Sequence, residues 1–280
     1  MKVSDVITNR ILDKLNEGVV PWHKPWAGGS WPKNIVSKKE YRGVNTFMLS
    51  CTEYSSPYWG TFKQISDLGG TIKKGEHGYP VVFYTWLEDK RGIENERKIP
   101  FMRFYKVWNM DQCEGIDVKK IPAAVVVNEN ERIAMCENLV NKMPKKPEIK
   151  HIEQRAYYSP TLDYVNVPKM ETFDSSETYY STLFHELTHS TGNKSRLARK
   201  EFDGNCFGSE SYSKEELVAE LGAAFLMGYC GIENKTLDNS AAYIQSWIKR
   251  LKNDKNLIIS ASGQAQKSCD FIMNKVTGEE

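Results

Sequence analysis

Two histidines and a glutamate stand at the spacing that a metal-dependent hydrolase needs, in the segment His185-Glu186-Leu187-Thr188-His189. On a helix, residues four apart lie on one face, so His185 and His189 can bind a single ion while Glu186 reaches a nearby water molecule. Zinc lowers the pKa of bound water toward 7 and polarises a carbonyl group, and Glu186 can carry the proton from the water to the leaving amine. The segment therefore predicts a zinc-dependent peptidase with Glu186 as its catalytic base.

A third protein ligand is expected, because catalytic zinc sites commonly use three and keep one position for water or substrate. Glu216 and Glu220 lie four residues apart in an acidic amphipathic segment over 213–226, so both face one side of a helix. We favour Glu216 as the ligand. Glu220 is the alternative ligand, or a carboxylate that accepts a hydrogen bond from a ligand histidine. Glu216 could instead cap the helix, because Ser213 precedes it by three residues. His151 is a further candidate ligand, although a histidine at the end of a strand is the preferred interpretation.

The motif must lie on a helix whose other face is packed, and the flanking residues predict one. Asp174, followed three residues later by Glu177, has the form of a capping box at the start of this helix. Gly192 stands just beyond the motif, where glycine commonly ends a helix. We therefore expect a helix of about 16 residues that carries the motif near its C-terminal end.

The chain is long enough for two domains, with 280 residues of which 40% are hydrophobic, as in an ordinary globular protein. Residues 1–127 contain six of the seven tryptophans, and they carry 19 Lys and Arg against 14 Asp and Glu. We predict an α+β protein with a small α+β N-terminal domain over 1–127 and a helix and linker over 128–150. A mostly helical second domain is expected over 151–280.

Apolar periodicity and helix-breaking residues divide the chain into expected elements. In the first domain we expect a helix over 3–16, a helix near 46–54 capped by Asn45, a helix starting near 59–65, and strands over 80–87 and 99–108. A helix over 130–142 leads to the second domain, where strands over 155–158 and 163–167 precede the motif helix. Two further helices are expected over 241–251 and 258–272.

The first residues and the cysteines indicate the cellular compartment. The N-terminus lacks the apolar stretch of a signal peptide, and the longest apolar run, 221–230, is too short to cross a bilayer. The six cysteines are scattered without a C-x-x-C pair, so we expect reduced, structural thiols. These features predict a cytoplasmic protein without a membrane partner.

Aromatic and cationic residues alternate along the first domain, as they do in proteins that bind single-stranded nucleic acid. Bases stack on exposed rings for roughly 1 to 3 kcal/mol each, while Lys and Arg side chains follow the phosphates. The candidate DNA-contacting residues are Trp22, Lys24, Trp26, Arg42, Asn45, Trp59, Lys63, Lys73 and Lys74. Tryptophans are more often core residues and the excess of positive charge is modest, so composition alone leaves a protein-binding domain open.

Long ordered segments of the chain resemble the ArdC-type antirestriction proteins, and the resemblance covers nearly the whole chain. In the first domain the matching segments are GVVPWHKPW (18–26), YRGVN (41–45), WGTFKQ (59–64) and KKGEHG (73–78). In the second they are YYSTLFHELTH (179–189), TG (191–192), SRL (195–197), EELVAEL (215–221) and YIQSW (243–247). Ser190 departs from the pattern, because an aromatic residue is common after the second histidine in this family.

The resemblance implies an N-terminal domain that binds single-stranded DNA and a C-terminal zincin-like metallopeptidase domain. It also implies a protein of plasmids, phages or integrated mobile elements that protects entering DNA from restriction in a bacterial host. The expected cofactor is Zn²⁺, with Mn²⁺ as the alternative, because histidine and carboxylate ligands bind both ions. The expected partners are single-stranded DNA and an unidentified protein substrate, which DNA binding would bring close to the peptidase.

Two other functions fit the same residues. The chain could be a non-proteolytic shield of single-stranded DNA whose metal is structural or regulatory. It could also be a peptidase whose first domain binds protein. Replacing Glu186 separates the first of these from a peptidase, and titration with an oligonucleotide at increasing salt separates the second.

Overall fold

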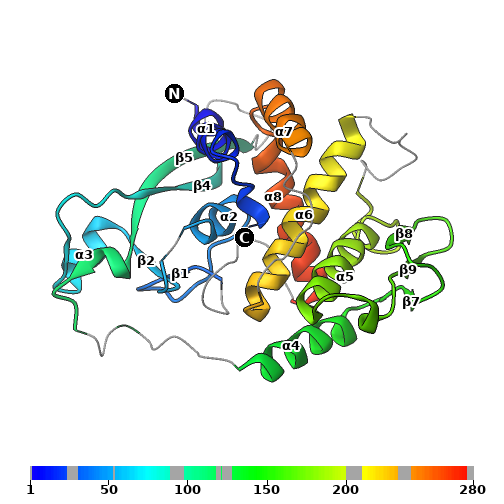
Figure 1. Ribbon diagram of the computed structural model, residues 1–280. Helices are drawn as coiled ribbons and strands as arrows, with labels where there is room; N and C mark the ends of the chain where they lie inside the picture. The colour runs from blue at the N-terminus through cyan, green and yellow to red at the C-terminus, as the bar shows by residue number, and fades with distance from the viewer. Residues whose placement is uncertain are drawn as a thin grey trace.

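The protein is an α+β molecule in which short sheets occupy the N-terminal part and helices dominate the C-terminal part (Figure 1). The computed structural model describes residues 2–23, 31–52, 54–88, 98–117, 121, 128–199, 210–232 and 241–275. The arrangement of sheets and helices confirms the expected α+β fold class. None of the described helices is long and apolar enough to cross a membrane.

The N-terminal part is built on a four-stranded sheet with strand order β1-β2-β5-β4. Its strands are β1 (Lys33–Asn34), β2 (Tyr58–Gly60), β4 (Tyr79–Glu88) and β5 (Lys98–Asn109), and the long antiparallel β4–β5 ribbon pairs Tyr79 with Val107 at its base. A small second sheet joins β3 (Thr71–Ile72) to β6 (Cys113–Glu114). The helices of this part are α1 (Val3–Asn16), α2 (Val44–Ser50) and α3 (Phe62–Asp67). Short 3-10 turns follow at Pro21–His23 and Met110–Gln112.

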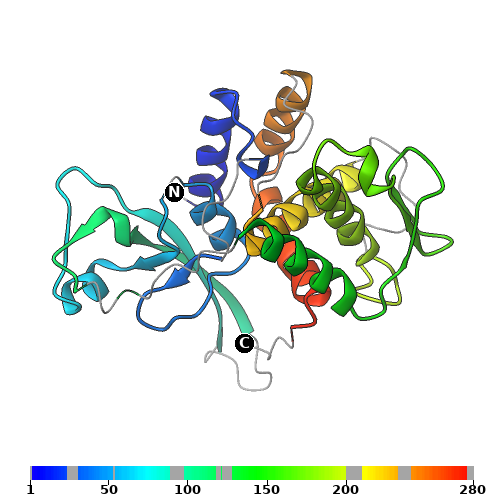
Figure 2. The same ribbon diagram turned by 60° about the horizontal axis from the view of Figure 1, so that its bottom comes forward.

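The C-terminal part surrounds a central buried helix, α6 (Glu210–Cys230), which contacts α5 (Ser176–Ser190), α4 (Glu129–Lys142) and α8 (Leu257–Ile272). Before α5 lies a three-stranded sheet of order β7-β9-β8, made of Glu148–Lys150, Tyr164–Asn166 and Tyr157–Ser159. A 3-10 turn at Met170–Thr172 leads into α5, and α7 (Ala241–Asn253) lies between α6 and α8 in the chain. In Figure 2, α1 and α7 stand side by side at the top of the molecule, in agreement with their contacts.

Three of the expected helix caps differ from what the structure shows. The N-cap of α5 is Ser175, whose hydroxyl accepts a hydrogen bond from the backbone N–H of Thr178, so the expected capping box at Asp174 is wrong by one residue. Helix α2 begins at Val44, after Gly43, so Asn45 is not its cap. Ser213 lies inside α6, three residues after its first residue, which excludes a capping role for the Ser213 and Glu216 pair.

One hydrophobic core contains side chains from both the N-terminal and the C-terminal part of the chain. One cluster of buried side chains combines residues of α1, α2 and the Pro21–His23 turn with residues of the C-terminal helices. Trp22 packs edge-on against Trp247 of α7, with ring centroids 5.6 Å apart. Trp31 donates a hydrogen bond of 2.9 Å from Nε1 to the carbonyl oxygen of Phe225 in α6. The N-terminal segments therefore share their core with the helices that follow the expected boundary at residue 127.

Five of the cysteines lie among the described residues, and no disulfide joins any two of them: Cys51, Cys113, Cys136, Cys230 and Cys269. Three of them, in α4, α6 and α8, are fully buried. They act as small apolar residues of the core, as we expected for reduced thiols.

Candidate metal centre

Helix α5 carries His185 and His189 on one face because its other side is committed to the core. Leu183, Phe184 and Leu187 are buried against the helices around them, which fixes the rotation of α5 about its axis. The two histidines are one turn apart and half-buried, and their rings meet at a centroid distance of 4.7 Å. The expected helix thus presents the motif as its spacing predicted.

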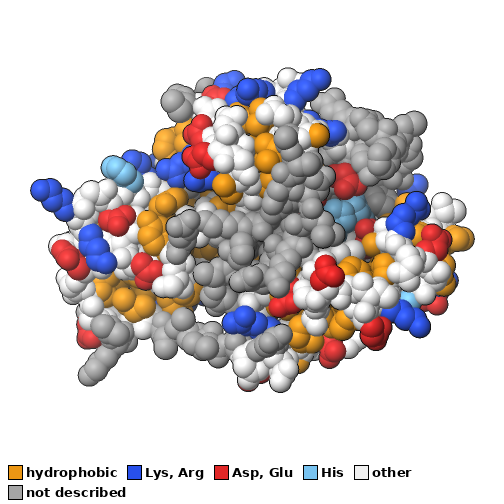
Figure 3. Space-filling model, in the orientation of Figure 1, with side chains coloured by type: hydrophobic (Ala, Val, Ile, Leu, Met, Phe, Trp, Pro, Cys, Tyr) orange, Lys and Arg blue, Asp and Glu red, His pale blue; other side chains and the backbone are white. Residues whose placement is uncertain are grey.

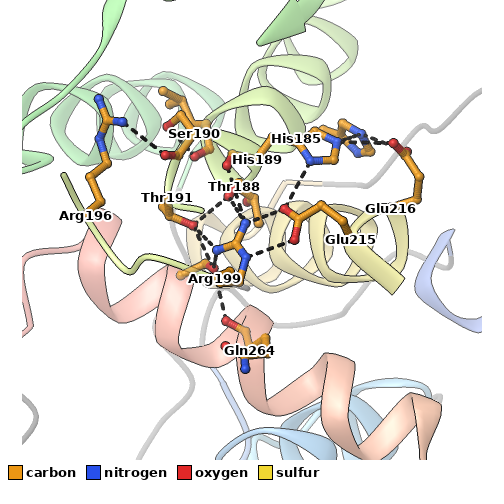
Figure 4. Close-up of polar contacts among 12 residues, drawn as sticks. His185, Thr188, His189, Ser190, Thr191, Arg196, Arg199, Glu215, Glu216 and Gln264 are labelled. Atoms are coloured by element: carbon orange, nitrogen blue, oxygen red, sulfur yellow. Dashed lines mark hydrogen bonds and ion pairs between the residues drawn. The ribbon is translucent and has the colours of Figure 1, made fainter. Parts of the chain in front are cut away.

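Helix α6 brings Glu216 to the same point (Figure 4). His185 Nε2 lies 3.1 Å from His189 Nε2, and the two nitrogen atoms lie 3.6 Å and 3.5 Å from the two carboxylate oxygens of Glu216. Among the described residues, these three side chains form the one group of His, Cys, Asp or Glu in which ligand atoms lie within 4.8 Å of one another. Figure 3 shows histidine and acidic side chains together at the surface of the C-terminal part.

The separations of these donors match a tetrahedral ion. Ligands that lie about 2.0 to 2.1 Å from a tetrahedral ion stand roughly 3.3 to 3.4 Å from one another. The two nitrogen atoms, 3.1 Å apart and each 3.5 to 3.6 Å from a different oxygen of Glu216, are close to that spacing. Two imidazole nitrogens that face each other at 3.1 Å need a proton or a cation between them, because their lone pairs repel. The donor set therefore fits a divalent metal ion.

The surrounding carboxylates give this site a negative field. Burial opposes the protonation of His185, but the hydrogen bond to Glu216 and the charges of Glu186, Glu220 and Glu216 outweigh it and raise the pKa of His185 to about 9. Glu186 is half-buried on the same helix and lies near enough to contribute to this shift. A field that holds a proton on an imidazole equally favours a metal cation at the same place.

A second carboxylate, Glu215, contacts the other ring nitrogen of His189, Nδ1. Its Oε1 lies 3.3 Å from His189 Nδ1, and Arg199 donates a hydrogen bond of 3.0 Å from Nε to Glu215 Oε2 and a shorter one from Nη2 to Oε1. Burial alone would raise the pKa of Glu215, but the bonds to His189 and Arg199 lower it, so this carboxylate is ionised. An ionised Glu215 favours the tautomer of His189 with the proton on Nδ1, which leaves Nε2 to bind metal.

Sequence reasoning missed both Glu215 and Arg199. The expectation placed the supporting carboxylate at Glu220, one helical turn beyond Glu216. In the structure Glu220 Oε1 accepts a hydrogen bond of 3.1 Å from the hydroxyl of Tyr243, and that hydroxyl accepts one of 3.2 Å from Trp22 Nε1. The signal for Glu215 was present as the first acid of the Glu-Glu pair, but no motif marked Arg199.

His151 lies outside the metal cluster. Its Nδ1 is 2.7 Å from the carbonyl oxygen of Val167, next to the ends of β7 and β9, and its side chain is exposed. It is therefore a histidine at the end of a strand, which was the preferred interpretation. Tyr179 and Tyr180 are buried packing residues near the start of α5.

Seven of the nine candidate DNA-contacting residues are described by the structure, and they fall into three groups. Trp22 and Trp59 are 0% and 1% exposed, so their rings serve the core and cannot stack on bases in this structure; that expectation is corrected. Arg42 pairs with Asp270 of α8, and Asn45 bonds the backbone of Val82 at the open edge of β4. The exposed lysines are Lys63, Lys73 and Lys74, whereas Lys24 and Trp26 lie outside the described residues.

Comparison with known proteins identifies the class of molecule that this fold and site define. Residues 1–108 match the N-terminal domain of the anti-restriction factor ArdC, and residues 135–264 match the zincin-like metallopeptidase domain. The crystal structure of metal-free antirestriction protein ArdC from plasmid R388 superposes with a TM-score of 0.78 at 36% identity, covering 98% of this chain and 97% of that one. The chain belongs to the family of ArdC-type antirestriction proteins.

Other relatives extend the comparison. The Mn(II)-bound structure of the same R388 protein has a TM-score of 0.76 at 36% identity, and 98% of each chain is covered. An uncharacterised protein of Sinorhizobium fredii, y4eC, is 32% identical, with 95% of this chain and 90% of y4eC covered. DNA primase TraC of Escherichia coli is 31% identical over 95% of this chain, which spans only 26% of TraC.

The two matched regions leave residues 109–134 between them. The expected division at residue 127 falls in this interval, and the linker over 128–150 contains α4 and β7. These boundaries stay a prediction.

Proposed function

We propose that this protein is a zinc-dependent peptidase joined to a part that binds single-stranded DNA, and that it protects incoming mobile-element DNA from restriction. The observation that carries the proposal is the close approach of the His185 and His189 Nε2 atoms to each other, at 3.1 Å, and to the Glu216 carboxylate, at 3.6 and 3.5 Å. The zincin-like domain supports peptide hydrolysis as the reaction class. The ArdC-type first domain supports DNA as the partner.

The proposed ligands are His185, His189 and Glu216, and the proposed ion is Zn²⁺. Two imidazoles and a carboxylate form a common zinc set, which leaves a position open for water and substrate. The Mn(II)-bound structure of the R388 relative makes Mn²⁺ the alternative ion. The bound ion would polarise the substrate carbonyl and lower the pKa of a water molecule.

Glu186, Glu215 and Arg199 have the remaining roles in the proposed reaction. Glu186 accepts a proton from the attacking water and delivers it to the leaving amine. Its half-buried position, one residue after His185, lets it reach solvent and the metal site together. Glu215, held by Arg199, keeps the imidazole of His189 in one orientation and one tautomer.

The proposed DNA-binding part lies within residues 1–108. Lys63, Lys73 and Lys74 have exposed side chains that can follow a phosphate backbone. A relative that is a DNA primase, and the name of the matched domain, both support a nucleic-acid partner. Binding to DNA would raise the local concentration of DNA-bound protein substrates at the peptidase site.

The test replaces Glu186 by Gln, with Glu177→Gln on the same helix as the matched control. We expect the native protein and Glu186→Gln each to bind one metal ion per chain, and Glu186→Gln to lose cleavage of DNA-bound protein and protection of an unmodified plasmid entering a restricting host. Glu177→Gln should retain both activities, because residue 177 lies about two turns before the motif, near the start of α5. Full protection by metal-loaded Glu186→Gln would instead support the non-proteolytic shield.

A further inference from the structure

The β4–β5 ribbon exposes an unusual amount of aromatic and apolar surface. Five of its large side chains, Phe83, Tyr84, Met102, Phe104 and Tyr105, are between 39% and 48% exposed. Concentrated exposure of this kind marks a binding surface in a soluble protein. Hydrophobic side chains with Lys and Arg beside them are visible on the N-terminal part in Figure 3.

The two faces of the ribbon are not equivalent. Val81 and Val107 share one face and are fully buried against Tyr41, Leu49 and Trp59, so this face is the core side at the base of the ribbon. Phe83, Arg103 and Tyr105 continue that core-side face toward the tip. The opposite face carries alternate residues of β5 and, on β4, Val82, which pairs with Phe104 and is half-buried against the main core cluster.

We name this opposite row the β5 stripe; it consists of Met102, Phe104, Lys106 and Trp108. Tyr84 pairs directly with Met102 across the ribbon and adds a second ring to that end. At the other end Trp108 contacts Phe62 of α3, with ring centroids 6.5 Å apart, and the Phe62 side chain is 65% exposed. Trp108 itself is half-buried against a core cluster that includes Ile65, so the exposed ring at this end is Phe62, and at the other end it is Tyr84.

The stripe has the composition of a surface for single-stranded nucleic acid. Alternate residues of a strand recur about every 6.6 to 6.8 Å, so the exposed Phe104 ring and Lys106 follow each other along the row, and Phe62 adds an exposed ring beyond Trp108. Lys106 is exposed within the row, and Lys63 is exposed next to Phe62 in the chain. The stripe contains no acidic residue that would repel phosphates.

We propose that single-stranded DNA lies along the β5 stripe, with bases stacked on Phe104 and Phe62 and phosphates against Lys106 and Lys63. This inference rests on the proposed function and specifies its DNA-binding surface. The alternation of cations with rings favours a nucleic acid over a protein partner, whose apolar patch would need no cations. The whole stripe lies within residues 1–108, the region that matches the ArdC N-terminal domain.

The aromatic residues proposed here to contact DNA are not the tryptophans that the sequence composition suggested. Trp22 and Trp59 are buried, whereas Phe104 and Phe62 present exposed rings on the described surface. Lys63 is the candidate that both arguments share.

The experiment measures binding of a fluorescent oligo-dT by the full chain, comparing Phe104→Ala with Phe83→Ala. Phe83 is a matched control, because it lies on the same ribbon with 46% exposure against 40% for Phe104, but faces the other side. We expect Phe104→Ala to weaken binding roughly 5- to 150-fold, the equivalent of about 1 to 3 kcal/mol of stacking. Phe104→Tyr should restore most of it, and Phe83→Ala should bind like the native chain.

A second pair of variants tests the cation. Lys106→Gln should reduce the slope of log affinity against log salt by about 0.7, the value for one phosphate contact with a single strand. Arg103→Gln, on the opposite face, should leave the slope unchanged. Melting curves verify that all of these variants are folded.

Three outcomes have different meanings. Native-like binding by Phe104→Ala, or equal loss in Phe83→Ala, overturns the stripe while the proposed function stands. Absence of oligo-dT binding by the native chain at low salt overturns the proposed function and the stripe together. Self-association of the native chain that Phe104→Ala abolishes, with unchanged DNA binding, assigns the stripe to a second copy and also overturns the proposal.

Discussion

At the scale of residues, Arg199 supports the proposed metal site through its contacts with Glu215. Its guanidinium bonds Glu215, donates 2.9 Å hydrogen bonds to Ser268 Oγ of α8 and to the carbonyl oxygen of Thr188 in α5, and also bonds Thr191. Its side chain is 2% exposed, and its planar fork can serve several acceptors at once. Arg199 therefore orients Glu215, and through it His189, with respect to three helices (Figure 4).

Glu215→Gln tests this support. Removing the negative charge weakens the hydrogen bond that residue 215 accepts from the His189 Nδ1 proton. We therefore expect the metal affinity to fall roughly 10- to 100-fold, the usual cost of losing such a supporting carboxylate. Zinc affinity is measured by competition with a chromophoric chelator. Asp270→Asn is the control, because Asp270 is another buried carboxylate with an arginine partner, Arg42, but it contacts none of the three proposed metal ligands. Both variants should melt earlier than the native chain, and a native zinc affinity in Glu215→Gln would contradict the role given to this residue.

At the scale of elements, the distance between α5 and α6 sets the geometry of the site. Gly222 of α6 faces Thr188 of α5, and a Cβ at position 222 would lie 2.5 Å from Thr188 Cγ2 and 2.6 Å from Oγ1. Thr188 is fully buried and donates a 2.7 Å hydrogen bond from Oγ1 to the carbonyl oxygen of Phe184, so it cannot easily move away. The glycine lets the helix that carries Glu216 approach the helix that carries the histidines.

Gly222→Ala and Gly263→Ala should therefore have opposite effects. Gly222→Ala forces α5 and α6 apart, and overpacking of this kind costs about 1 to 3 kcal/mol. Gly263 lies in α8 with nothing within 4 Å of its added Cβ, so alanine there should stabilise the protein by up to about 1 kcal/mol through helix propensity. Unfolding in urea measures both changes, and zinc competition should show weaker binding only for Gly222→Ala. A neutral Gly222→Ala would contradict the close contact.

At the scale of the whole molecule, the two family domains share one buried cluster. Phe47 of α2 is 0% exposed and contacts Trp22, which in turn packs on Trp247 of α7. Arg42 of the N-terminal part pairs with Asp270 of α8. A core that crosses between regions couples their unfolding, because neither can lose its packing without exposing the other.

Phe47→Ala should destabilise both parts together. We expect a loss of about 3 to 5 kcal/mol, the usual cost of removing a buried phenylalanine side chain. Tryptophan fluorescence, which reports mainly on the N-terminal part, and zinc release, which reports on α5 and α6, should shift to the same lower denaturant concentration. Phe62→Ala is the control, because its side chain is 65% exposed and its loss should cost less than about 0.5 kcal/mol. Separate transitions for the two probes would show that the parts fold independently.

Local patterns were sufficient for most of the elements. The helices over 3–16, 130–142, 241–251 and 258–272 were expected within two residues of α1, α4, α7 and α8. The capping box of α3, with Thr61 and Gln64, begins that helix within the expected segment. The cap of α5 was misplaced, because Asp174 and Ser175 are both good caps and only the hydrogen bond to Thr178 distinguishes them.

The sequence by itself determined the motif helix, most of the other helices, the long β4 and β5 strands, and the pairing of His185 with His189, since each depends on neighbours within a few residues. It did not predict the short strands β1, β2, β3, β6 and β7, which depend on pairing with distant segments. Tertiary structure alone decided which carboxylates meet the histidines, because Glu215 and Glu216 arrive on a helix whose rotation follows from packing around Gly222. It also decided that Trp22 and Trp59 are buried while Phe104 is exposed. An aromatic ring has the same local pattern in either place, and its exposure is fixed only when distant segments pack over it.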